Sequence, residues 1–181
     1  MIVGALALVW MNPILAADVS VSLITEDQDI CRVEGQFFVA APLSTVWEVL
    51  TDYNRIGEFV PFMKRSNVKE TLEKRLLVEQ EALARFFFFV RRMYVLLAMQ
   101  EVPLKRILFR DVSQKDFELY EGSWLIEPSP QGIWVRYKVR AKPNFSVPGF
   151  VAREMFRKTA RGLLKAVQIE ILRRHSVKLR G

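Results

Sequence analysis

The residue types that build nucleophilic and metal sites are scarce in this 181-residue chain. Cys31 is the only cysteine and His175 the only histidine. The usual Ser/His and Cys/His arrangements, and the clustered ligands of a zinc site, are therefore not predicted. His175 lies close to the C-terminus, where a surface histidine is the simpler interpretation. We predict no metal ion and no cofactor, and the sequence assigns no catalytic residue.

Acid/base chemistry remains open to tyrosines and carboxylates. Glu79, Glu81 and Asp111 are candidates because they lie in strand-like stretches. Such a group acts as a general acid or base when a cavity perturbs it. The enzymatic hypothesis therefore requires at least one of these groups to face a cavity.

Basic residues gather at the C-terminal end of the chain. The formal charge is +7, and from Pro148 onward nine Lys and Arg residues face only Glu154 and Glu170. The nine are Arg153, Arg157, Lys158, Arg161, Lys165, Arg173, Arg174, Lys178 and Arg180. An exposed basic helix can contact an anionic membrane, an acidic partner or RNA. It can equally solvate one face of an amphipathic helix, and the sequence leaves both interpretations open.

The elements that must position these residues begin with a strand and a helix. Residues 31–40 mix β-branched and aromatic residues and end before Pro42, which is typical of a strand. Pro42 then favours a helix start, and apolar residues at 46, 47, 49 and 50 predict the buried face of a helix. Asp52 is predicted to cap a second short helix that runs towards Phe59 and Pro61.

Between Phe62 and Ala141 the pattern changes to strands joined by short polar turns. Six strand-like segments follow one another at hairpin spacing, which predicts an antiparallel sheet. The last segment alternates strictly, with apolar residues at 133, 135, 137, 139 and 141 and large or charged residues between them. One face of the sheet is therefore predicted to be buried and the other solvated.

From Gly149 to Arg174 the spacing of apolar residues becomes that of a helix. At about 1.5 Å per residue this helix would be roughly 39 Å long, which is enough to cross a whole sheet. A strand, two helices, six strands and one long helix form a compact α+β domain most simply when the sheet curls around that helix.

Two sequence motifs resemble a known superfamily. Residues 41–54 read APLSTVWEVLTDYN and are followed by Phe59-Val60-Pro61. This string resembles the polyketide cyclase/dehydrase and coenzyme Q-binding branch of the START-like (SRPBCC) superfamily. Gly122-Ser123-Trp124 is similar to the Gly-x-Trp motif on a late strand of that branch. With the order of the elements, the resemblance covers about residues 31–175.

The resemblance implies a helix-grip fold, with a cavity for a lipid, isoprenoid quinone, sterol, hormone or polyketide between the curved sheet and the terminal helix. The candidate ligand-binding residues are Tyr53, Phe59, Trp124, Tyr137, Phe145, Phe150, Met155, Phe156 and Thr159. Tyr53, Tyr137 and Thr159 would orient a carbonyl or hydroxyl group of the ligand. Ordinary core packing is the competing explanation for each residue taken alone.

Two further segments carry functional hypotheses. Residues 141–150, with two prolines, a glycine and two phenylalanines, are predicted either to be a lid over the cavity or to be a simple connector. Phe86 to Phe89 would place aromatic rings on both faces of a strand, where a membrane, a partner or the segment from Asp18 to Ile30 would cover them.

The N-terminal residues predict export. Residues 1–17 are apolar, are interrupted by Asn12 and Pro13, and end in Ala16-Ala17, which is typical of a cleaved signal peptide. The predicted location is the bacterial periplasm, and an uncleaved membrane anchor is the alternative. The predicted organisation is a signal peptide (1–17), an N-terminal extension (18–30), a START-like ligand-binding domain (31–175) and a basic tail (176–181).

The leading functional hypothesis is noncatalytic binding or transfer of a hydrophobic small molecule. A cyclase or dehydratase that uses the same pocket is the first alternative. The second is docking of the basic C-terminal helix on an anionic membrane or on ribosomal RNA, and export would exclude the RNA partner.

Overall fold

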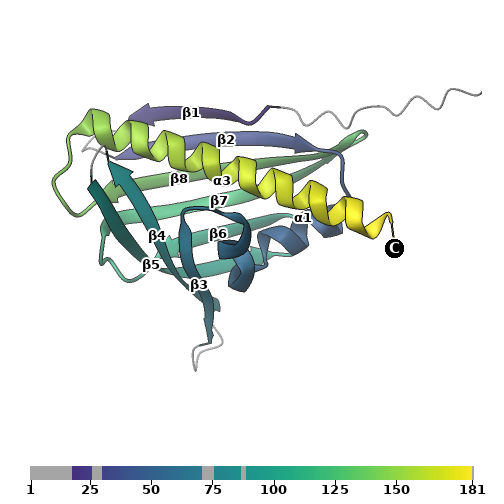
Figure 1. The fold of residues 1–181 in the computed structure, drawn as a ribbon, viewed down its shortest axis with the longest axis horizontal. Coiled ribbons are helices and arrows are strands. Elements are labelled where there is room, and N and C mark those ends of the chain that lie inside the picture. The colour runs from purple at the N-terminus through teal and green to yellow at the C-terminus, as the bar shows by residue number, and fades with distance from the viewer. Residues whose placement is uncertain (1–17, 26–29, 71–75, 87–88, 181) are drawn as a thin grey trace, which may run out of the picture.

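The computed structural model describes residues 18–25, 30–70, 76–86 and 89–180 (Figure 1). The predicted signal peptide lies outside these residues. The strands are β1 (Ser20–Thr25), β2 (Cys31–Val39), β3 (Met63–Glu70), β4 (Leu76–Phe86), β5 (Phe89–Val102), β6 (Arg106–Asp111), β7 (Phe117–Ser129) and β8 (Gly132–Pro143). The helices are α1 (Leu43–Leu50), the 3-10 turn η2 (Tyr53–Arg55), α2 (Ile56–Phe59) and α3 (Gly149–Lys178).

The described strands form one antiparallel sheet in the order β1-β2-β8-β7-β6-β5-β4-β3. Figure 1 shows the sheet curving around α3, with β3 and β4 on the opposite side of the helix from β1 and β2. The six predicted strands between Phe62 and Ala141 are present as β3 to β8. The predicted α+β helix-grip fold is therefore confirmed.

The two faces of the sheet differ as the alternation predicts. In β8 the side chains of Ile133, Val135, Tyr137, Val139 and Ala141 are buried, and the residues between them are exposed or half-buried. The outer residues of β8 form ion pairs across the strands, such as the contact of 3.4 Å between Lys138 Nζ and Glu34 Oε1 of β2. The core therefore lies between the concave face of the sheet and α3.

Helix α3 packs closely on one side of the curved sheet, against β1 and β2. Gly35 of β2 allows this approach, because a Cβ atom there would lie 2.4 Å from Leu164 Cδ1. A side chain at this position would push the helix away from the sheet. The open space of the fold is therefore left on the other side of α3, next to β4 and β5.

Residues 18–30 are not a simple extension, because Ser20–Thr25 form β1. Val21 and Leu23 alternate with polar residues and pack at the border of the core, which explains the strand. β1 pairs with β2 and not with β4 or β5. The side chains of Phe86 to Phe89 lie outside the described residues, so the prediction that this segment covers them stays a prediction.

The region around α3 departs from the predictions at two points. Asp52 does not cap a helix, because its side chain forms no cap hydrogen bond and accepts one from Arg174 Nη2 at 2.7 Å instead. The helix continues beyond Arg174 to Lys178, whose Nζ lies 2.6 Å from Glu48 Oε2 of α1. Part of the predicted tail is therefore helical and is held by an ion pair.

Among the described residues, no helix combines the length and the apolar character that crossing a bilayer requires.

Candidate functional site

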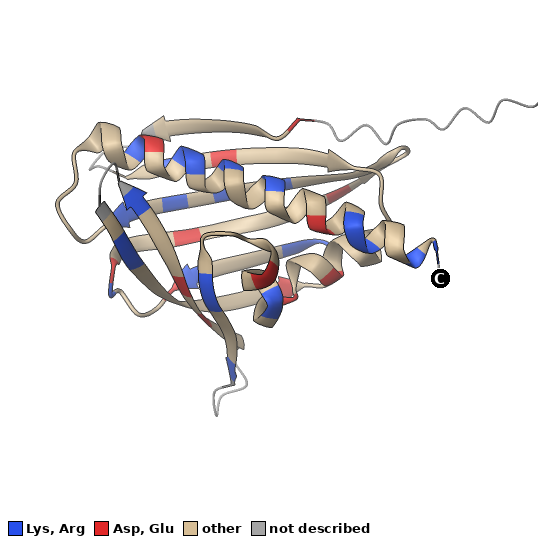
Figure 2. Cartoon of the chain, in the orientation of Figure 1, with Lys and Arg blue, Asp and Glu red and all other residues tan. Residues whose placement is uncertain are grey.

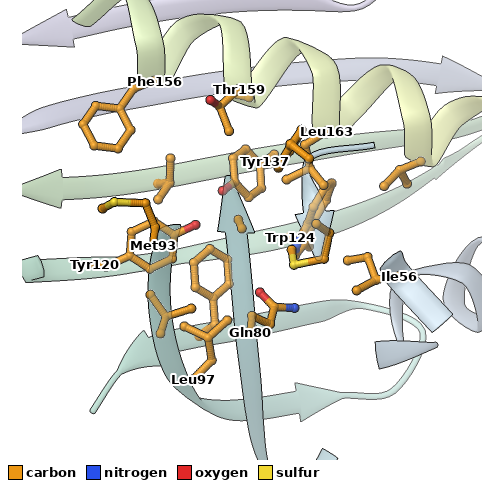
Figure 3. Close-up of a pocket in the computed structure, with 18 of the residues that line it drawn as sticks. Ile56, Gln80, Met93, Leu97, Tyr120, Trp124, Tyr137, Phe156, Thr159 and Leu163 are labelled. Carbon is orange, nitrogen blue, oxygen red and sulfur yellow. The ribbon is translucent and has the colours of Figure 1, made fainter. Parts of the chain in front are cut away.

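A cavity of about 160 Å³ lies between α3 and the concave face of the sheet (Figure 3). Its wall is built from the α1–α2 segment, the inward residues of β3 to β8 and one side of α3. The cavity lies there because α3 packs against β2, so the inward side chains of β4 and β5 do not reach the helix. The predicted hollow between sheet and helix is therefore present.

Seven of the nine predicted ligand-binding residues line this cavity. They are Tyr53, Phe59, Trp124, Tyr137, Met155, Phe156 and Thr159. They come from η2, α2, β7, β8 and α3, so residues far apart in the sequence meet at one site. Their role in binding a ligand remains a prediction.

Phe145 and Phe150 do not line the cavity, so the structure does not bring these two predicted ligand-binding residues to the site. The Phe145 ring lies outside it, with its centroid 4.1 Å from Cζ of Arg91. Phe150 is 63% exposed in the first turn of α3. The segment before α3 leaves β8 over the end of the sheet, so both rings stay clear of its concave face.

The same segment does not act as a lid in this structure. Asn144 N donates to the carbonyl of Asp116 at 3.1 Å, and Asp116 in turn accepts hydrogen bonds from Arg91 Nη2 and Tyr94 N at 2.8 Å. These bonds fasten the segment to β5 and to the turn before β7. The connector interpretation therefore fits the structure better.

The wall contains residues that the sequence analysis did not select. All four described methionines line it: Met63, Met93, Met99 and Met155. The alternation of Met93, Val95, Leu97 and Met99 in β5 was a visible signal for inward side chains. Methionine is flexible and polarisable, so this wall adapts to ligands of different shapes.

Polar atoms on the wall are few and lie at separate places. Gln80 points towards the cavity from β4 in Figure 3, and its Nε2 donates to Ser66 Oγ at 3.2 Å. The amide oxygen of Gln80 is therefore an available acceptor. Thr159 of α3 is an exposed wall residue, so it marks the entrance.

The entrance lies between α3 and the strands β3 and β4. Met155 and Leu163 are half-buried on the same side of the helix as Thr159. Across the gap, Phe62 Cε1 would lie 3.6 Å from a Cβ atom built on Gly162 of α3. Phe62 therefore approaches the helix closely enough to narrow the opening.

An aromatic cluster with two phenols forms the deepest part of the wall. The hydroxyl groups of Tyr120 and Tyr137 interact with each other, and burial raises the pKa of both phenols. The rings of Trp124 and Tyr137 lie 4.6 Å apart, and Phe117 lies 4.8 Å from Tyr120. These phenols remain protonated at neutral pH and can donate hydrogen bonds, so they suit an acidic role better than a basic one.

Tyr53 occupies the other end of the cavity. Its hydroxyl donates to Glu101 Oε1 at 2.6 Å, and burial raises the pKa of this phenol further than the hydrogen bond does. The proposed polar handle therefore already has a partner on β5. Its ring still contributes to the wall, so a ligand would meet the apolar side of Tyr53 rather than a free hydroxyl.

The three candidate carboxylates do not face the cavity. Gln80 and Ala82 of β4 point inward, so Glu79 and Glu81 point to the opposite side of the strand. Glu79 Oε2 pairs there with a guanidinium of β3, and Asp111 accepts from Leu96 N at 2.9 Å. No Asp, Glu, Lys, Arg or His occurs among the described residues of the wall.

A buried ion cluster joins α3 to the α1–α2 segment beside the cavity. Arg174 donates to Glu170 Oε1 and to Asp52 Oδ2, both at 2.7 Å, and lies 3.6 Å from Glu48 Oε1. Cζ of Arg174 is also 6.0 Å from the ring centroid of Phe59, a wall residue. This cluster therefore fixes the position of the wall contributed by α2.

The chain resembles known proteins in sequence and in fold. A family model described as polyketide cyclase / dehydrase and lipid transport matches residues 39–168. No curated protein matches the sequence. These comparisons and those with solved structures confirm the predicted membership of the START superfamily, while the assignment to its coenzyme Q-binding branch stays a prediction.

Three solved structures illustrate the similarity. The STAR-related lipid transfer protein of Xanthomonas axonopodis has 18% identity and a TM-score of 0.69, over 86% of this chain and 94% of that one. Human STARD10 has 14% identity and a TM-score of 0.69, over 91% and 73%. The Zhui aromatase/cyclase of Streptomyces sp. R1128 has 19% identity and a TM-score of 0.65, over 80% and 95%. At these identities the similarity shows a shared fold.

Proposed function

The chain belongs to the polyketide cyclase/dehydrase and lipid transport family, and from this premise we propose that it binds and carries an uncharged hydrophobic small molecule without transforming it. The candidate molecules are a lipid, an isoprenoid quinone and a polyketide-like compound. The observation that supports this most directly is the cavity wall, because no charged side chain occurs among its described residues.

The chemistry of the wall selects for neutral ligands. An ionised group in this cavity would lose its hydration and find no opposite charge among the described wall residues. An apolar ligand gains about 0.8 kcal/mol for each buried methylene, so ten buried carbons contribute roughly 8 kcal/mol before the costs of association. Micromolar affinity corresponds to about 8 kcal/mol after those costs are subtracted. A ligand with this affinity must therefore bury more than ten carbons or form additional contacts.

The cavity volume sets how much of a ligand fits. About 160 Å³ is close to the volume of an engineered protein cavity that binds benzene, and it is below the roughly 300–1,000 Å³ of typical ligand pockets. The structure as it stands therefore holds one ring or a short chain. A longer ligand would extend through the entrance beside Thr159 or widen the gap between α3 and β4.

A cavity-filling variant tests this proposal. Ala82 points into the cavity, and Glu81 is its neighbour on the opposite side of β4. We expect Ala82→Phe to lose at least about tenfold in affinity for a fluorescent fatty acid, because the new ring occupies the cavity. Glu81→Phe should bind like the parent protein. Native mass spectrometry after gentle purification would also show whether a hydrophobic compound is retained.

Two outcomes would contradict the proposal. If both variants fold, as judged by circular dichroism, and bind the fatty acid equally well, the ligand does not occupy this cavity. A parent protein that retains no hydrophobic compound and binds none of the three candidate classes would also contradict the proposal.

The second candidate function is that of a cyclase or dehydratase, and the Tyr120–Tyr137 pair favours it. Two interacting phenols in an apolar wall can polarise a ligand carbonyl as acids. Tyr137→Phe separates the two functions, because it removes the hydroxyl and keeps the ring. Unchanged ligand affinity with complete loss of turnover of a poly-β-ketone substrate would establish the enzymatic role.

We further propose that the chain is exported to the bacterial periplasm with residues 1–17 removed. The apolar run that ends at Ala16-Ala17 supports this proposal. N-terminal sequencing of the protein from a periplasmic fraction should begin at Asp18. Full-length protein in the membrane fraction would indicate an uncleaved anchor instead.

A further inference from the structure

The basic residues of α3 divide into two groups according to their partners. Near the C-terminal end, the cations are paired within the protein: Arg173 and Arg174 with Glu170, and Lys178 with Glu48. Between residues 153 and 165, Arg153, Arg161 and Lys165 form no ion pair with any described residue. The charge of α3 that remains available to an external partner is therefore concentrated between residues 153 and 165.

These cations lie along one ridge of the helix. Arg153, Arg157, Arg161 and Lys165 are spaced by four residues, and all four are exposed. Residues four apart lie above one another on a helix, so the ridge is roughly 18 Å long. Figure 2 shows blue segments along this part of α3. Of the four ridge residues, only Arg157 forms an ion pair with a described residue, and its partner is Glu154 of the same helix.

A large apolar side chain is exposed at the start of the same ridge. Phe150 is 63% exposed in the first turn of α3, three residues before Arg153. Val90 and Arg92 of β5 are exposed too, but the inward direction of Met93 and Val95 turns them to the convex side of the sheet, away from the ridge.

We propose that this end of the protein docks on an anionic lipid bilayer. We call it the α3 entry surface and define it by Phe150, Arg153, Arg161 and Lys165. Cations that form no ion pair with a described residue are attracted to anionic headgroups, and the exposed Phe150 ring beside them can enter the interfacial layer. RNA would use the cations, but a single exposed ring gives it at most one stacked base. The combination therefore favours a membrane over a nucleic acid.

Vesicle binding of the full chain tests the docking surface. We expect binding to vesicles of phosphatidylcholine with 30% phosphatidylglycerol and weak binding to phosphatidylcholine alone. Each cation near an anionic surface contributes about fivefold to partitioning, so the triple variant R153Q/R161Q/K165Q should bind roughly 100-fold more weakly. The matched control R110Q/R136Q/K138Q removes the same charge from the outer face of the sheet and should bind like the parent protein.

A second measurement reports on the surface itself and does not depend on the N-terminal residues. In Phe150→Trp, the added tryptophan should be quenched by brominated lipid in anionic vesicles and not in neutral ones. Equal losses in both triple variants, or no quenching at position 150, would overturn the proposal. Binding to an RNA oligonucleotide that R153Q/R161Q/K165Q abolishes, with no vesicle binding, would overturn it in favour of RNA. None of these readouts requires a ligand in the cavity.

Discussion

Replacing Arg174 with methionine tests the buried ion cluster that joins α3 to the α1–α2 segment. Only 9% of the Arg174 side chain is exposed, and it bonds to Glu170 and Asp52 at 2.7 Å. Breaking a buried ion pair by removing one partner costs about 3–5 kcal/mol. Glu170 keeps its two bonds from Arg173, and Asp52 is 20% exposed, so we expect the lower end, about 3 kcal/mol.

The neighbouring variant Arg173→Met is the matched control. It removes the same charge and two hydrogen bonds to the same carboxylate, but the Arg173 side chain is 55% exposed. Exposed ion pairs contribute little, so this variant should melt close to the parent protein. For a chain of this size, about 3 kcal/mol corresponds to a decrease in Tm of roughly 6–12 °C for Arg174→Met.

Urea unfolding at neutral pH, followed by circular dichroism, measures both free energies of unfolding. The slope of the free energy against urea should stay the same, because neither substitution changes the surface exposed on unfolding. The reasoning is refuted if the two variants lose equal stability, since burial would then not decide the contribution of the pair. An Arg174→Met variant as stable as the parent would show that the cluster does not hold the α1–α2 segment in place.

Further predictions concern pH and close packing. Hydrogen bonds from Arg173 and Arg174 outweigh burial and lower the pKa of Glu170 from its ordinary 4.5 to about 2. The resulting stability is present above pH 4.5 and lost as the pH falls through about 2, so Glu170→Gln should flatten this part of the acid unfolding curve. Gly122→Ala should cost more stability than Gly35→Ala in urea titrations. A Cβ on Gly122 would lie 2.2 Å from the backbone oxygen of Lys138, whereas the backbone atom nearest a Cβ on Gly35 is the oxygen of Ser20 at 3.0 Å, and its closer contact is the side chain of Leu164, which yields when α3 shifts. Equal losses would contradict this.

Most of the fold was predictable because its signals are local. Alternation over residues 133–141 and the helical spacing from Gly149 identify β8 and α3, and both patterns arise from a side chain being either inside or outside. β1 was missed because it is short and follows the apolar N-terminal run. Its pairing with β2 depends on a distant partner that no local pattern identifies.

The candidate site was predictable only in part, for a related reason. Aromatic residues on inward positions, such as Trp124 and Tyr137, reach the cavity because their strands place them there. Phe145 and Phe150 looked equivalent in the sequence, but the path of the segment before α3 carries them outside. The cavity volume could not be predicted at all, because it depends on how closely Leu164 approaches Gly35.

Because α3 lies off-centre, the cavity has a fixed side next to β1 and β2 and a free side next to β3 and β4. On the fixed side, the helix is seated on β1 and β2 and is locked to the α1–α2 segment by Arg174. On the free side, β3 is the last strand of the sheet and pairs only with β4 within it, although Val68 N of β3 also donates to Asn54 Oδ1 of η2 at 2.8 Å. We therefore expect a guest larger than the present hollow to widen the gap between α3 and β4, while the helix keeps its contacts with β1 and β2.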